Sequence, residues 1–111
     1  MRPRSQVKFV DERVKRAYYS LEKGDAAERE LFKWLTRAFS DLEENAFCGI
    51  QIQKGLIPKS YLKKYWVDNL WKYDLPKGWR LLYSVRGNEI IVISIILEWL
   101  SHKEYERRFG Y

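Results

Sequence analysis

Two amphipathic helices follow a short alternating strand at the start of the chain. Residues 6–10 alternate between polar and apolar positions, which predicts a first strand. Asp11 precedes apolar residues at helical spacing, and Gly24 ends this predicted helix. Residues 25–28 form a capping box that opens a longer helix with an apolar stripe as far as Leu42. The two helices are expected to form an antiparallel hairpin.

The period of the pattern changes in the second half of the chain. Residues 51–58 are expected to form an irregular connection, and residues 59–67 a short helix that begins after a proline. A period of two then predicts three strands, at 70–75, 79–85 and 90–99, with turns at 76–78 and 86–89. Ser101 is a candidate cap for a last helix over 102–109.

These elements predict one α+β domain over residues 1–111, in the order β-α-α-β-β-β. Hairpin connections make the last three strands antiparallel. We therefore expect an antiparallel sheet with the helical hairpin on one face, the other face partly open, and a short C-terminal helix.

Strand alternation places basic side chains on the open face. Lys72 in the first hairpin strand, and Arg80, Ser84 and Arg86 in the next, all point away from the predicted helical pair. A solvated sheet face also commonly carries Lys and Arg, so this arrangement alone does not assign a function.

Composition supports a basic, aromatic-rich surface. The net charge is +6, and aromatic residues make up 16% of the 111 residues. Residues 51–111 hold eleven Lys and Arg against six Asp and Glu, so most of the excess lies there. Cations interleaved with aromatic rings suit nucleic acid, because phosphates need positive charge and unstacked bases need flat partners. Modestly basic surfaces also occur in proteins that bind no nucleic acid.

Several other chemistries have no sequence support. The longest apolar run is too short to span a bilayer, and the first residues lack a secretory signal, so we expect a cytoplasmic protein without membrane contact. The single cysteine permits no internal disulfide, and the single histidine permits no multi-histidine metal site. No glycine-rich phosphate loop is present, and we expect neither a cofactor nor a metal.

Two short motifs carry a family resemblance. Residues 78–83 read Gly-aromatic-Arg-aliphatic-aliphatic-Tyr after a turn, and residues 102–105 read His-Lys-Glu-Tyr after an Ile-rich strand. With the order of elements, these motifs make the chain resemble the RelE/ParE superfamily of toxins from type II toxin–antitoxin systems. The resemblance implies a RelE-like fold.

RNA-cleaving members of this superfamily are mRNA interferases, which act on ribosome-bound mRNA and so inhibit translation. The resemblance implies a metal-independent endoribonuclease in which Arg80 stabilises the phosphate, Lys72 assists as a cation, and His102 or Tyr105 transfers protons. Its implied partners are the ribosome, mRNA and a cognate antitoxin protein. Asp74 and Trp99 depart from the pattern, since some relatives have basic residues there.

Further residues are candidates for contacts with RNA or with the antitoxin. The RNA candidates are basic residues of the second half: Lys54, Lys59, Lys63, Lys64, Lys77 and Arg86. The segment 54–66 is equally consistent with an amphipathic helix that covers the sheet edge and exposes its lysines. An antitoxin would need an apolar groove, expected beside the helical pair near Tyr18, Trp34 and Phe39, although these three rings also suit a core.

Two alternative functions stay open at this point. One is a ParE-like toxin that acts on DNA gyrase without cleaving RNA. The other is a catalytically inactive relative. Arg80, His102 and Tyr105 favour RNA cleavage over the ParE-like alternative.

Overall fold

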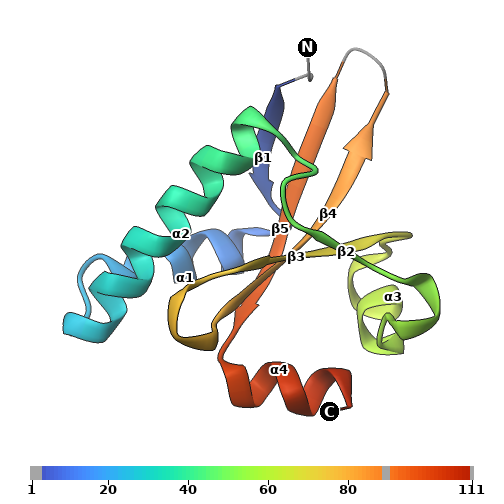
Figure 1. Cartoon of the computed structure of the whole chain (residues 1–111). Helices are drawn as coiled ribbons and strands as arrows, with labels where there is room; N and C mark the ends of the chain where they lie inside the picture. The colour runs from blue at the N-terminus through green and yellow to red at the C-terminus, as the bar shows by residue number, and fades with distance from the viewer. Residues whose placement is uncertain (1–3, 89–90, 111) are drawn as a thin grey trace.

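The computed structural model describes residues 4–88 and 91–110. In these residues a mixed five-stranded sheet has two α-helices on each side, which is an α+β architecture (Figure 1). The elements are β1 (Ser5–Phe9), α1 (Glu12–Leu21), α2 (Ala26–Glu44), β2 (Ile50–Ile52), η1 (Lys54–Leu56), α3 (Lys59–Tyr65), β3 (Leu70–Asp74), η2 (Pro76–Gly78), β4 (Arg80–Gly87), β5 (Val92–Leu100) and α4 (His102–Phe109). Glu89 and Ile90, where a predicted turn meets a predicted strand, lie outside the described residues.

The strands lie in the order β1-β5-β4-β3-β2. The pairs from β2 to β5 are antiparallel, but β1 is parallel to β5. The prediction of an antiparallel sheet is therefore wrong for β1. The strand β2 was not predicted, and it overlaps the start of the irregular connection expected over residues 51–58. Because β4 occupies one edge of β5, β1 pairs along the other edge, and residue periodicity does not record the direction of such a pairing.

The helical pair covers the first face of the sheet as predicted. Asp11 caps α1 by accepting a hydrogen bond from the Val14 amide at 2.9 Å. Asp25 and Glu28 form the reciprocal capping box that opens α2. The apolar stripes of both helices pack on the inward residues of the sheet, and together they bury Val14, Tyr18, Leu31, Leu35, Ala38, Phe39, Leu42, Leu75, Leu81, Tyr83 and Ile96.

The second face carries α3 and α4 and has a core of its own. Its buried residues are Ile57, Tyr61, Val67, Leu70, Leu82, Leu97, Leu100 and Tyr105. The sequence predicts a partly open second face, but α3 and α4 bury more of it than expected. The reason is that β5 has apolar side chains on both sides, and both sides have to be buried. Ser84, predicted on an open face, is fully buried there, and its hydroxyl donates to the Asn69 side chain at 3.2 Å.

A fully buried tyrosine ties the segment after α2 to the sheet. The Tyr83 hydroxyl donates to the Ala46 carbonyl at 2.8 Å and accepts from the Gly49 amide at 3.1 Å. A Cβ atom at Gly49 would lie 2.5 Å from both the Lys72 carbonyl oxygen and the Tyr83 hydroxyl. Glycine is therefore required at this position for close approach, and the approach places β2 against β3.

We expect Gly49→Ala to lower the free energy of unfolding by about 2 kcal/mol, because the methyl group forces apart backbone and a buried ring. Gly55→Ala is the matched control, since a Cβ there meets nothing within 4 Å. Urea unfolding followed by circular dichroism measures both variants. Equal midpoints for the two would contradict the steric argument.

Candidate functional site

Two cations from neighbouring strands meet under one aromatic ring of α4. The Nζ atom of Lys72 (β3) lies 5.5 Å from the centre of the Tyr105 ring, and the guanidinium carbon of Arg80 (β4) lies 5.2 Å from it. Tyr105 is buried, and the side chains of Lys72 and Arg80 are only 19% and 18% exposed. The structure thus brings together three of the four predicted catalytic residues, which we call the Lys72–Arg80–Tyr105 cluster.

Asp74 supplies the negative charge that this cluster needs. Its Oδ1 atom lies 3.2 Å from Lys72 Nζ and 3.0 Å from Arg80 Nε. The Arg80 contact is an ion pair without hydrogen-bond alignment, because the buried Nε–H has no aligned acceptor among the described residues. A buried N–H of this kind favours a further acceptor. Asp74, which departs from the family pattern, therefore pairs with both cations of the cluster.

Caps and ring contacts set the position of α4 over the strands. Ser101 and Glu104 form a capping box at its first turn, as the sequence predicts for Ser101. Tyr105 stacks on Phe109, with ring centres 4.4 Å apart, and Phe109 lies 5.9 Å from the Tyr61 ring of α3. The two helices of the second face are thus joined through aromatic contacts.

His102 lies at the start of α4, beside the β3–β4 turn. Its side chain is 56% exposed, and its Nε2 contacts Glu106 one turn further along the helix. A Cβ atom at Gly78 would lie 2.8 Å from His102 Cβ, so the turn passes directly beside the histidine. The helical spacing of His102 and Glu106 is visible in the sequence, and this spacing is the signal that identifies Glu106 as a partner.

The residues predicted to contact RNA do not all lie together. Most lie on η1, α3 and β4, and one pairs with the helix α2. The exposed side chains of Lys54, Lys59, Lys63 and Lys64 lie on η1 and α3. Arg86 is exposed at the far end of β4 from Arg80. Lys77 instead pairs with Glu30 of α2, at 3.5 Å, and so belongs to the side of the helical pair.

The rings expected to receive a partner lie mainly in the first core. Tyr18 and Phe39 are buried with their ring centres 5.0 Å apart, and Trp34 is half-buried against the same core. As placed, Tyr18 and Phe39 offer a partner almost no surface. Aromatic content alone does not distinguish a core ring from a docking ring.

A second charged group on this face was not expected from the sequence. Arg108 pairs with Glu98 at 2.9 Å, and the Arg108 guanidinium lies 5.9 Å from the Tyr61 ring. Burial, together with the nearby Glu98 carboxylate, raises the pKa of Tyr61, so this hydroxyl stays protonated at neutral pH. The Glu98–Arg108 pair joins β5 to α4, and its partners are ten residues apart with no helical or strand spacing to mark them.

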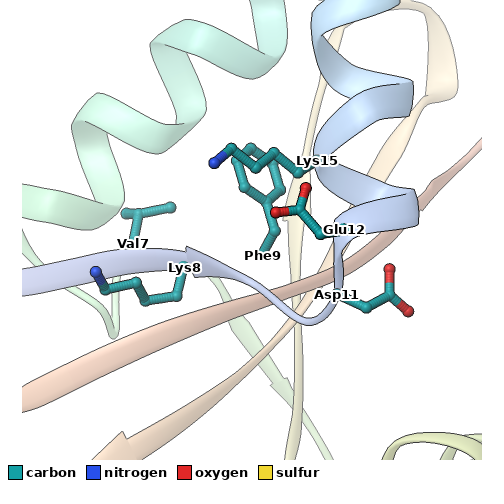
Figure 2. Close-up of a pocket in the computed structure, with 6 residues that line it drawn as sticks. All are labelled: Val7, Lys8, Phe9, Asp11, Glu12 and Lys15. Atoms are coloured by element: carbon teal, nitrogen blue, oxygen red, sulfur yellow. The ribbon is translucent and has the colours of Figure 1, made fainter.

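One hollow lies away from the cluster, along β1 and the first turn of α1 (Figure 2). It measures about 470 Å³, and none of the predicted site residues lines it. Its charged side chains are two lysines and two carboxylates, and Asp11 among them already caps α1. Figure 2 shows the side chains spread along the strand and the helix rather than converging on one point.

Comparison of the chain with protein families, with curated proteins and with solved structures gave no match. The RelE/ParE resemblance thus stays an interpretation of the sequence motifs. Within residues 4–88 and 91–110, no helix is both long and apolar enough to cross a membrane. No group of three or more His, Cys, Asp or Glu side chains in the same residues has an arrangement that fits a metal ion.

Two glycines with nearly the same positive φ angle test the contact between the turn and His102. Gly78 and Gly110 have φ values of +80° and +79°, but only Gly78 has a close neighbour. Alanine at either position costs about 1 kcal/mol of stability, because the left-handed conformation is unfavourable for a residue with a Cβ atom. We expect Gly78→Ala to be the more destabilising in urea and to shift the NMR signals of His102, the only histidine. Gly110→Ala should leave those signals in place, and an equal response from the two variants would contradict this contact.

Proposed function

We propose that the chain is an RNA-cleaving toxin of the RelE kind that inhibits translation, with the Lys72–Arg80–Tyr105 cluster as its active site. The observation that supports the proposal is the pair of cations held under Tyr105, with an Arg80 Nε–H that has no aligned acceptor in the part of the chain that the structure describes. Two fixed cations at a solvent border suit a phosphate whose charge grows in the transition state. An acidic antitoxin is the corresponding protein partner, since the chain carries a net charge of +6.

The reaction is an attack of a ribose 2′-oxygen on the adjacent phosphorus. The bond from phosphorus to the 5′-oxygen breaks, which leaves a 2′,3′-cyclic phosphate and a 5′-hydroxyl. One proton leaves the 2′-hydroxyl and one is delivered to the 5′-oxygen. Lys72 and Arg80 hold the phosphate, and His102 is the more accessible proton-transfer group, because Tyr105 is buried.

The direct test is cell-free translation followed by primer extension on the mRNA. Discrete cuts within codons of ribosome-bound message are the expected result. A chain that leaves the message intact and instead blocks supercoiling by DNA gyrase would overturn the proposal in favour of the ParE-like alternative.

Arg80→Met removes the charge and keeps an unbranched side chain under Tyr105. We expect the loss of about 3 kcal/mol of transition-state stabilisation, which lowers the cleavage rate by roughly 150-fold. The thermal midpoint should be nearly unchanged. Lys77→Met is the control, since it removes an exposed cation of the same hairpin that pairs with Glu30. Single-turnover cleavage measures both variants, and a normal rate in Arg80→Met would remove this side chain from the mechanism.

A bound phosphate has to compete with Asp74 for the two cations. Asp74→Asn should therefore tighten RNA binding about fivefold, or about 1 kcal/mol, because it removes the competing charge. Glu43→Gln makes the same change in net charge on an exposed position of α2. Fluorescence anisotropy with a labelled RNA compares the two variants. If both bind RNA equally well, Asp74 does not oppose the substrate.

A further inference from the structure

Trp66 is the most exposed large apolar side chain among the described residues. It is 82% exposed, although a ring of this size contributes most when it is buried. It follows α3 in the left-handed conformation, with φ 56° and ψ 33°. A bulky residue in this conformation is strained, and such strain persists only where the surroundings impose it.

The surroundings of Trp66 hold its backbone and leave its ring outside. Arg86 donates from Nη2 to the Trp66 carbonyl oxygen at 3.0 Å. Val67, the next residue, is buried in the second core, and Tyr65, the preceding one, is half-buried against it. Both neighbours are thus anchored, and the indole projects from a fixed position.

The charge around the indole is positive. Residues 45–67 contain four lysines and no Asp or Glu. Lys59 and Lys63 are four residues apart on one side of α3, and Trp66 directly follows the last residue of that helix. The nearest carboxylate in sequence, Asp68, already accepts a hydrogen bond from the Asn69 side chain at 2.8 Å.

Basic hollows extend this surface in two directions. Between α3 and α4 a hollow of about 310 Å³ is lined by Lys59, Arg107 and Arg108, with Glu104 as its one carboxylate. On the other side, a groove of about 430 Å³ beside Tyr65 and Val67 has Lys8 and Arg86 as its charged residues. The helix that carries Tyr105 thus also contributes Arg107 and Arg108 to the first of these hollows.

We propose that Trp66, Lys59 and Lys63 form a second subsite for single-stranded RNA, in which one base stacks on the indole and the lysines bind the neighbouring phosphates. Unpaired bases expose a flat face that an exposed ring can cover, whereas a double helix keeps its bases stacked inside. The subsite rests on the proposed function, because the same strand would continue to the cluster. Tyr61 of α3 is buried and offers no ring surface to a base.

The test measures binding of a fluorescein-labelled oligouridine of about 12 nucleotides by anisotropy. Trp66→Ala should weaken binding about tenfold, and Trp66→Phe should restore part of the loss, because a smaller ring still stacks. Tyr19→Ala is the matched control, since Tyr19 is an exposed aromatic on α1. Unchanged binding by Trp66→Ala would overturn the subsite.

The lysines are tested through the salt dependence of binding. Lys59→Gln with Lys63→Gln should reduce the slope of log affinity against log salt by about 1.4, for two lost phosphate contacts to a single strand. Lys15→Gln with Lys23→Gln removes the same charge from the α1 side and should have a smaller effect. Equal slopes for the two double variants would overturn the assignment of the lysines.

The subsite and the proposed function fail in different ways. If the wild-type chain cuts no message but binds oligouridine through Trp66, the subsite holds and the cleavage reaction does not. If the message is cut and Trp66→Ala binds RNA normally, only the subsite is overturned. If Trp66→Ala relieves growth inhibition without changing RNA affinity, the indole serves a protein partner and the subsite is again overturned.

Discussion

The burial of Tyr105 against the sheet is the contact on which the second face depends. Its ring lies over both Lys72 and Arg80 and stacks on Phe109, so it fixes α4 and shields the two cations together. Cations withdrawn from water need a compensating charge, which Asp74 provides. Because α4 also carries His102, one buried ring determines where the cations and the histidine lie relative to each other.

Much of the fold follows from local patterns that the sequence contains. The capping boxes begin α2 and α4 where predicted, and alternation assigns Leu81 and Leu82 to opposite faces. The short strand β2 was missed, because three residues give too little periodicity and its place depends on Gly49 approaching Tyr83. The parallel pairing of β1 joins the two ends of the sequence, and no local pattern encodes it.

The site was predictable as far as it depends on strand alternation. Lys72 and Arg80 share a face because alternation in the paired strands β3 and β4 requires it. That α4 places Tyr105 on the same face is a result of packing. Their burial was not predictable, since it depends on how closely α4 approaches the strands. The buried rings Tyr18 and Phe39 show the same limit, because aromatic side chains serve a core and a docking surface equally well and only packing separates them.

The pairing of Ser5 with Val92 also has a consequence for the order of events during synthesis. At about 5–20 residues per second, β1 leaves the peptidyl-transferase centre roughly 4 to 17 seconds before its partner strand exists. During that interval α1 and α2 have only part of the surface that later covers their apolar stripes. Since Tyr105 is made after all five strands, a nascent chain has no assembled cation cluster until α4 has been translated.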